Sequence, residues 1–597
     1  MSKIAKRLSL HREMMLKNGI QASIIPSTDP HQSEYISECW KYREFLSGFT
    51  GSFGTLVIGL ESAGFWTDSR YFLQAEVELK GSGIELFKLA LPETPVLEKW
   101  IASQGYKSVG VDGSLFSTTE ALRLSGYFSE RGIGFISNFR PYTQVWLDRP
   151  SLPKGKLKIF DITFSGETIQ SKLSRLREKM KSSDTNCLIL TALDDIAWTF
   201  NFRGEDVDFN PVSICYAFID MNKAYLFVES CKVDSEMSDY LTINNIETRD
   251  YHEFSDFISN LRNVRILFDM ARNNYDSYMN IHESCKKINE ISPATTLKSI
   301  KNPTEIAGFR EAMIKDGVAL TKLFIWLESE TSPNNIEGHK FPSECDISDK
   351  AAKLRIEQGD YLCESFAPII SYKEHGAIVH YEAVPETASI VCGEGVLLMD
   401  LGGHYQNGTT DVTRTLYING IPPQQYKEDF TCLLKGVIAL TTACFPAGTR
   451  GTQLDILARK FIWERSLNYL HGTGHGVGHC LYVHEGPQSI RMNENPLTIE
   501  PGMVMSNEPA LYRTGEYGVR NENVMRCYEK EPTQFGRFFT FETLTLLPID
   551  IKSIEIKLLD ETEKKWINDY HEKVFDILSE RLDENEKVWL KKKTCKI

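Results

Sequence analysis

Residues 471–479 read H-G-T-G-H-G-V-G-H, so three histidines recur at every fourth position with four glycines between them. The histidine interval alone would suit a helix that presents imidazole rings along one face. Each glycine inside a helix costs roughly 1 kcal/mol relative to alanine, and four of them therefore disfavour a helix here. We predict a strand or loop whose backbone passes close to other groups, with imidazoles available as ligands or proton carriers.

The size of the chain excludes a single hydrophobic core, because 597 residues predict three or four domains. The formal net charge of −14 argues against a nucleic acid partner, and the lysines at 591–593 are expected to form a solvated tail after the last helix.

The 13 cysteines form no CxxC pair, which predicts reduced thiols. No apolar run is long enough for a signal peptide or a membrane span, so we expect a soluble cytoplasmic protein with no membrane partner.

Helical and strand patterns alternate along the chain and predict an α/β (α+β) fold with domains at 1–155, 156–301 and 302–597. Strands are expected at 22–25, 55–58, 64–66, 187–190, 217–219 and 224–228, and helices at 8–18, 95–102 and 167–181. The order of elements in the second domain repeats that of the first, which suggests a duplication. Asn302-Pro303 followed by Glu305 predicts a capped helix that runs to about Leu327, and a helical extension is expected after Asp560.

Acidic residues at the ends of predicted strands surround the glycine-rich segment. A strand at 396–400 ends in Asp400, and a turn at Asn407-Gly408 precedes a second strand that contains Asp411. An Asn-Gly turn favours a hairpin, which would bring Asp400 and Asp411 onto neighbouring strands. Two further strands are predicted downstream, at 503–508 and at 517–522.

The downstream strands supply two more carboxylates, Glu508 and Glu522, and on the second strand Arg520 and Glu522 are expected on one face. Taken singly, each acidic residue could be a turn or cap residue, a lone histidine a solvated loop residue, and Arg520 half of an exposed ion pair. Their joint occurrence favours a metal site, because converging carboxylates repel one another unless cations neutralise them. The oxygen-rich donor set with one imidazole suits two Mn²⁺ ions and also accepts Co²⁺, Fe²⁺ or Zn²⁺.

With these motifs the chain resembles the Xaa-Pro aminopeptidases (aminopeptidase P) of the cytosolic three-domain type, which are pita-bread metallopeptidases. The matching motifs in the last domain lie at 400, 409–415, 471–476, 483–487, 507–509 and 520–523. Motifs at 49–52 and 66–71 resemble the first domain of that family, and motifs at 193–198 and 209–211 resemble its second domain. The resemblance implies two creatinase-like α/β domains, a pita-bread catalytic domain and a homodimer.

The resemblance also implies the role of each site residue. The expected ligands of a dinuclear, usually manganese, centre are Asp400, Asp411, His475, Glu508 and Glu522. His380 corresponds to a histidine near the scissile nitrogen, His484 to one that binds the scissile carbonyl oxygen, and His471 to one near the substrate proline. Arg520 and Tyr512 correspond to residues that orient ligands and bridging water, and His479 is expected to be a bystander. Leu401 and Ala510 depart from the family pattern without removing a ligand.

The resulting hypothesis is an aminopeptidase that hydrolyses the bond between an N-terminal residue and a proline at the second position of a peptide. A hydroxide that bridges two metals would attack the carbonyl, with Glu508 shuttling its proton and Asp400 helping to receive the α-amine. A prolidase, which cleaves only X-Pro dipeptides, is the nearest alternative, although the three-domain length favours the aminopeptidase. A non-catalytic peptide-binding module of the same fold is a third reading, but such modules typically lose metal ligands, and here all five positions are filled.

Overall fold

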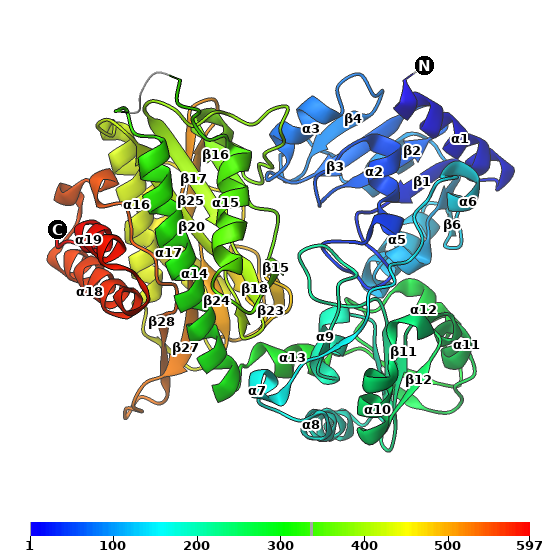
Figure 1. Cartoon of the computed structure of the whole chain (residues 1–597). Helices are drawn as coiled ribbons and strands as arrows, with labels where there is room; N and C mark the ends of the chain where they lie inside the picture. The colour runs from blue at the N-terminus through cyan, green and yellow to red at the C-terminus, as the bar shows by residue number, and fades with distance from the viewer. Residues whose placement is uncertain (1, 335–337) are drawn as a thin grey trace. The chain divides into compact units, whose positions relative to one another are not determined.

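The computed structural model describes residues 2–334 and 338–597 of the chain (Figure 1). These residues form two compact units, Met1–Leu297 and Lys298–Ile597. Among the described residues, no helix is both long enough and apolar enough to span a membrane. All of the cysteine side chains are free thiols, as predicted.

The first half of the first unit is a six-stranded mixed sheet in the order β4-β3-β2-β1-β5-β6. Its strands are β1 (Ala22–Ile25), β2 (Thr55–Gly59), β3 (Ala63–Thr67), β4 (Glu85–Lys88), β5 (Ser108–Gly110) and β6 (Gly134–Ile136). Its helices are α1 (Lys3–Lys17), α2 (Tyr42–Ser47), α3 (Phe72–Glu78), α4 (Leu97–Ser103), α5 (Thr118–Ser129) and α6 (Tyr142–Val145). The three predicted strands are confirmed, whereas α1 begins earlier than predicted because the Ser2 hydroxyl caps it by accepting from the Ala5 N–H at 3.1 Å.

The second half of this unit repeats the same plan in the order β12-β11-β10-β8-β13-β14. Its main strands are β8 (Cys187–Leu190), β10 (Tyr216–Asp220), β11 (Ala224–Phe227), β12 (Ile246–Arg249), β13 (Arg265–Leu267) and β14 (Lys286–Ile288), with β7 (Lys158–Ile159) paired to β9 (Phe202–Arg203). Its helices are α7 (Ile162–Ser165), α8 (Ile169–Ser182), α9 (Leu193–Thr199), α10 (Ser235–Ile243), α11 (Phe254–Ser259), α12 (Tyr275–Asn280) and α13 (Pro293–Ser299).

The two sheets also agree in the direction of each pairing. In both, the first strand pairs antiparallel with the second and parallel with the fifth, and the third pairs parallel with the fourth. The predicted duplication is therefore confirmed at the level of topology. The predicted boundary at 155 falls between α6 and β7, and as a domain boundary it stays a prediction.

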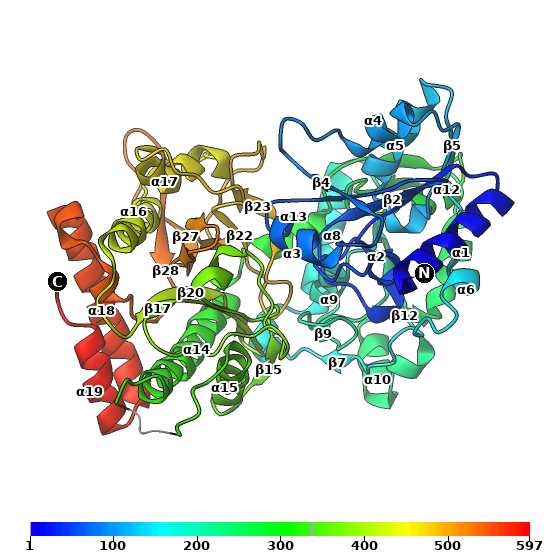
Figure 2. The ribbon, with the colours of Figure 1, turned by 90° about the horizontal axis from the view of Figure 1, so that it is seen from above.

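The second unit begins with the long helix α14 (Pro303–Glu330), which starts at the predicted capping box of Asn302 and Glu305. Its other helices are α15 (Glu344–Ile356), α16 (Gln424–Thr441), α17 (Gly451–Trp463), α18 (Glu561–Leu578) and α19 (Glu584–Lys593). Figures 1 and 2 show α18 and α19 side by side at one edge of this unit. The lysines at 591–593 lie in the last turn of α19 and not in a tail after it, and Lys593 pairs with Glu328 at 3.1 Å. Positive charge there complements the helix dipole.

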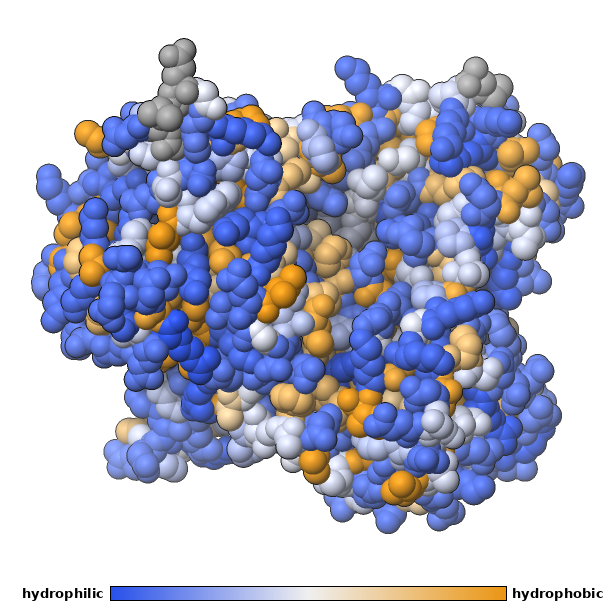
Figure 3. All heavy atoms as spheres, in the orientation of Figure 1, coloured by the Kyte–Doolittle hydropathy of each residue, from blue (hydrophilic) through white to orange (hydrophobic). Residues whose placement is uncertain are grey.

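Strands of the second unit form several small sheets under these helices. One sheet contains β16 (Ile369–Tyr372), β17 (Gly395–Leu401) and β20 (Val412–Ile418), and another contains β15 (Tyr361–Glu364), β18 (Gly403–Tyr405) and β19 (Gly408–Thr409). The largest has the order β21 (Phe445–Pro446), β28 (Phe538–Thr543), β27 (Asn523–Glu529), β24 (Val504–Asn507), β22 (Gly474–Gly476) and β23 (Glu485–Ile490), and β25 (Ala510–Arg513) pairs with β26 (Tyr517–Arg520). Apolar side chains from these strands and helices are buried in the core, while the face seen in Figure 3 is mostly hydrophilic.

Candidate metal centre

Two of the predicted ligands lie where β17 and β20 pair. These strands are antiparallel, with Asp400 opposite Thr413, and Asp411 immediately precedes β20. The two carboxylates therefore sit at the same end of the strand pair. The Asn407-Gly408 turn does not join these two strands directly, because it closes a separate short hairpin between β18 and β19. Asp400 and Asp411 do converge as predicted, but the chain that connects β17 to β20 is longer than a simple hairpin turn.

Of the other two carboxylates, Glu508 follows a strand of the second unit, and Glu522 lies between two of its strands. Glu508 directly follows β24, and its N–H donates to the carbonyl of Thr473 at 2.7 Å, which holds it beside the glycine-rich segment. The single strand predicted at 517–522 is wrong, because β26 ends at Arg520 and β27 begins at Asn523. Glu522 lies at this junction, where its N–H donates to the carbonyl of Thr413 at 3.0 Å. The strand is interrupted there because β26 pairs with β25, whereas β27 pairs with β24 and β28.

The glycine-rich segment forms the short strand β22 with His475 at its centre, in agreement with the predicted strand or loop. A Cβ atom on Gly474 would overlap the carbonyl oxygen of Ser506, and one on Gly476 would overlap that of Glu485. The glycines are required by this close backbone approach. The Nδ1 of His475 lies 2.9 Å from the carbonyl of Gly476, which can only accept, so Nδ1 carries the proton and Nε2 is left as the ligand atom.

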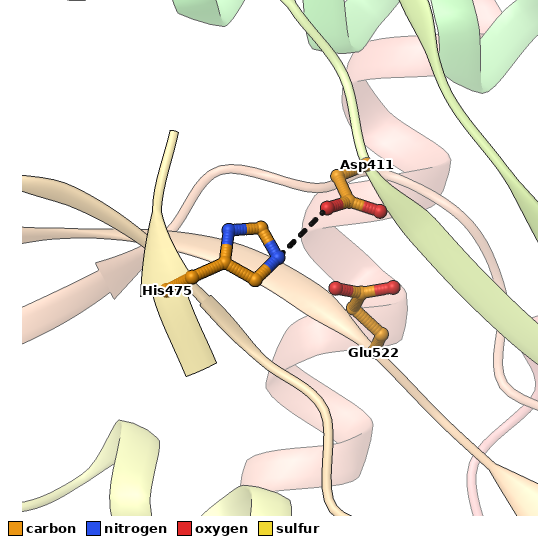
Figure 4. A group of neighbouring side chains, drawn as sticks. All are labelled: Asp411, His475 and Glu522. Atoms are coloured by element: carbon orange, nitrogen blue, oxygen red, sulfur yellow. Dashed lines mark ion pairs between the residues drawn. The ribbon is translucent and has the colours of Figure 1, made fainter. Parts of the chain in front are cut away.

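Three candidate ligands meet within a small space (Figure 4). Ligand atoms of Asp411, His475 and Glu522 all lie within 4.8 Å of one another. The Nε2 atom of His475 is 3.4 Å from Asp411 Oδ2 and 3.4 Å from Glu508 Oε1. Asp400 is buried beside them, and its Oδ1 atom has no hydrogen-bond partner among the described residues. A buried carboxylate oxygen of this kind fits a cation, which would satisfy it.

The electrostatics of the cluster fit the same donor set. Burial, opposed by His475 and reinforced by Asp411, raises the pKa of Glu508 to about 7. Burial also raises the pKa of Asp400, and it raises that of Glu522 with a further contribution from the charge of Asp411. Burial would lower the pKa of His475, but Asp411 and Glu508 outweigh it and raise the value to about 9. Burial therefore favours protons on Asp400, Glu508 and Glu522, and divalent metal ions would replace those protons.

A hydrogen-bonded chain leads away from Asp400 through Arg520. The guanidinium donates to Asp400 Oδ2 at 2.5 Å and to the hydroxyl of Tyr512 at 2.6 Å. The Tyr512 hydroxyl therefore donates its proton to His471 Nε2 at 2.9 Å, while His471 Nδ1 donates to the carbonyl of Gly472 at 2.7 Å. Burial raises the pKa of Tyr512 to about 12, so this phenol stays protonated. The predicted role of Arg520 and Tyr512 as orienting residues fits this geometry.

Two hydroxyl groups of the site were missed by the sequence analysis. Thr413 donates to Glu522 Oε2 at 2.8 Å and accepts from Arg520 Nε at 3.1 Å. Ser506 accepts from the N–H of His475 at 3.0 Å and donates to Glu508 Oε1 at 3.2 Å. Each lies two residues from a candidate ligand on the same extended segment, and this alternation in T-T-D-V-T and S-N-E was the available signal.

The remaining predicted histidines, His484, His380 and His479, have different surroundings. The ring of His484 packs edge-on against His475 with centroids 4.4 Å apart. His380 is half-buried in a turn after the 3₁₀ helix η5 (Lys373–Ala377), and η5 packs closely on β26, where a Cβ on Gly518 would overlap the Gly376 carbonyl. His479 is buried and packs against Phe309 with ring centroids 5.4 Å apart, and its bystander role stays a prediction.

Fold and donor set together define a metallopeptidase, and sequence models of known families agree. The Creatinase/Prolidase N-terminal domain matches twice, at residues 7–138 and 148–305. Metallopeptidase family M24 matches residues 307–529, and the C-terminal region of peptidase M24 matches residues 537–597. The predicted architecture of two creatinase-like domains followed by a pita-bread domain is thereby confirmed.

Full-length relatives narrow this class further. The chain is 36% identical to a probable Xaa-Pro aminopeptidase P of Ajellomyces capsulatus, over 99% of this chain and 98% of the relative. It is 36% identical to aminopeptidase P2 of Arabidopsis thaliana, over 95% of this chain and 84% of the relative. A crystal structure of an X-prolyl aminopeptidase from Caenorhabditis elegans, described as a cytosolic enzyme with a di-nuclear active site, superposes with a TM-score of 0.94 at 30% identity and covers 100% of both chains. The chain belongs to the Xaa-Pro aminopeptidase P family, which confirms the predicted resemblance.

Proposed function

We propose that this protein is a metallo-aminopeptidase that hydrolyses the bond between the N-terminal residue of a peptide and a proline at the second position. The observation that carries the proposal is the meeting of buried carboxylates with His475 at paired strand ends, in a chain similar over its full length to Xaa-Pro aminopeptidases. An X-Pro bond has no N–H, so peptidases that read this donor handle it poorly, and a dedicated site has a physical reason to exist.

We propose Asp400, Asp411, His475, Glu508 and Glu522 as the ligands of two divalent cations, with Mn²⁺ as the physiological metal. Bound there, the cations would lower the pKa of a shared water and polarise the scissile carbonyl. The oxygen-rich donor set favours manganese over metals that prefer nitrogen and sulfur ligands.

The protein groups would then orient the substrate and move protons. Glu508 is a partly buried carboxylate beside the place of the attacking water, which suits a group that accepts a proton from that water and releases it later. His484 lies against His475 and would donate to the carbonyl oxygen as negative charge develops there. Asp400 would receive the free α-amine, His380 would assist the leaving proline nitrogen, and His471 would contact the proline ring.

The test is an assay of the full-length chain titrated with Mn²⁺, on X-Pro and on X-Pro-Y-Z peptides with the same first residue. Release of the N-terminal residue from the longer peptide is expected. Cleavage restricted to the dipeptide would replace the proposal with a prolidase. Absence of bound metal after loading with Mn²⁺ would replace it with a non-catalytic peptide-binding module.

We further propose a cytoplasmic location and a homodimer. The similarity to the nematode protein described as cytosolic supports the location. The dimer is an expectation from the family resemblance, and light scattering on the purified full-length chain tests it. A monomeric mass at micromolar concentration would contradict it.

A further inference from the structure

Glu344, the first residue of α15, is a completely buried carboxylate outside the candidate metal centre. Its Oε1 accepts from the N–H of Tyr372 at 2.7 Å and from His375 Nδ1 at 3.0 Å. Its Oε2 accepts from the hydroxyl of Tyr381 at 2.8 Å and from the N–H of Ser389 at 2.7 Å. An ionised carboxylate offers about four lone-pair positions, so these four donors saturate it. The N-terminal end of a helix also stabilises the negative charge.

Two of these donors lie on either side of His380 in the chain. His375 belongs to η5, and Tyr381 directly follows His380, so one carboxylate holds both ends of the segment 375–381. The His375 and Tyr381 rings also stack, with centroids 4.4 Å apart and planes 28° apart. Backbone bonds close the turn between them, from the Ile378 N–H to the His375 carbonyl and from the Tyr381 N–H to the Ile378 carbonyl.

The opposite side of the same segment is fixed against the strand that leads to Arg520. Gly376 and Gly518 approach each other closely. A Cβ atom on Gly518 would overlap the carbonyl oxygen of Gly376, and a Cβ atom on Gly376 would lie 2.8 Å from the nitrogen of Gly518. The turn is therefore held between β26 on one side and the Glu344 carboxylate on the other. A turn clamped in this way holds the half-buried His380 in one orientation.

We infer that the cluster of Glu344, His375 and Tyr381 positions His380 for transfer of a proton to the leaving proline nitrogen. This inference rests on the proposed function. The leaving group is a secondary amine, which must gain a proton as the C–N bond breaks, and the donor must lie within hydrogen-bond reach at that moment. A displacement of about 1 Å at such a position costs about 100-fold in rate, so loosening one hydrogen bond of the clamp is expected to slow the chemical step.

The alternative is that the cluster only stabilises the fold, and a double-mutant cycle separates the two. Tyr381→Phe removes the hydroxyl donated to Glu344 and keeps the stacked ring. Tyr361→Phe is a control, because the Tyr361 hydroxyl also donates to a carboxylate of the same unit, the partly buried Glu364, at 2.9 Å. His380→Ala removes the group that the clamp is inferred to position.

The measurement is kcat and KM of the metal-loaded full-length enzyme on an X-Pro-Y peptide. We expect Tyr381→Phe to lower kcat about tenfold with KM within about twofold, and Tyr361→Phe to change neither beyond about twofold, since a partial displacement falls below the 1 Å case. In the His380→Ala background, Tyr381→Phe is expected to have no further effect on kcat. A substrate with 4-fluoroproline, whose nitrogen is less basic, is expected to reduce the effect of Tyr381→Phe.

Equal losses from Tyr381→Phe in the wild-type and His380→Ala backgrounds would overturn the inference, as would an equal loss of kcat from Tyr361→Phe. If Tyr381→Phe does not fold, His375→Gln tests the other arm of the clamp in the same cycle with the same criteria. Failure of the wild-type enzyme to cleave any X-Pro-Y peptide would overturn the proposed function as well. Additive effects with an active wild-type enzyme would overturn only the positioning role.

Discussion

Thr413 provides a test of how the candidate metal centre is supported, because one hydroxyl joins two of its charged groups. The hydroxyl donates to Glu522 Oε2 at 2.8 Å and accepts from Arg520 Nε at 3.1 Å, and the side chain is completely buried. Thr413→Val keeps the branched shape and removes the hydroxyl. Glu522 then loses a donor that orients its carboxylate, and Arg520 loses one acceptor.

The size of the effect follows from what is removed. Outer hydrogen-bond partners of metal ligands contribute about 10- to 100-fold in metal affinity, which corresponds to about 1.4–2.8 kcal/mol of binding free energy. The buried Arg520 N–H left without an acceptor costs about 1–3 kcal/mol of unfolding free energy. Thr413→Val is therefore expected to bind Mn²⁺ about 10- to 100-fold more weakly than the wild type and to unfold at a lower denaturant concentration.

Calorimetric titration of Mn²⁺ into the metal-free full-length chain measures this affinity. Thr415→Val is the matched control, since among the described residues the Thr415 hydroxyl bonds only the backbone of Arg520, donating to the carbonyl at 2.7 Å and accepting from the N–H at 3.0 Å. It is expected to lower the stability but to leave the metal affinity within about twofold, because it contacts no candidate ligand directly. Unchanged affinity in Thr413→Val, or equal weakening in both variants, would refute the reasoning.

Three further predictions concern stability. Glu485 is buried between Lys298, at 3.0 Å, and Lys301, so Glu485→Ala removes the carboxylate that pairs with two buried cations. This variant is expected to lower the unfolding free energy by about 3–5 kcal/mol in a denaturant titration, and a loss below about 1 kcal/mol would contradict the expectation. Burial lowers the pKa of His571 from 6.5 to about 4, so below pH 6.5 the unfolded chain binds a proton that the folded chain excludes. The unfolding free energy should therefore fall by up to about 3 kcal/mol between pH 6.5 and pH 4, a loss that His571→Gln should remove. Chelation of bound metal is expected to abolish activity and to lower the unfolding free energy by about 2.7 kcal/mol relative to protein at 100 times the metal Kd, and an unchanged denaturation midpoint would contradict metal binding.

Local patterns predicted the secondary structure best where a single period or cap decides it. The buried strand at Ala22–Ile25 and the capped start of α14 at Asn302 were found because apolar runs and capping boxes act within a few residues. The strand predicted through Asn521 was wrong because the break there depends on which strands pair with β26 and β27. No local pattern encodes that choice of partner.

The candidate ligands, the glycines that must pass close to other backbone and the family membership were all determined by the sequence itself. Each of these features depends on which residue occupies a given position, because a metal ion requires particular donor side chains and a close backbone contact requires a glycine. Only the tertiary structure decided how these residues are supported. The Thr413 hydroxyl, the chain from Asp400 through Arg520 and Tyr512 to His471, and the Glu344 clamp all join side chains that are distant in sequence. The relative placement of such groups is set by strand register and helix packing, which is why it emerges only when the chain is folded.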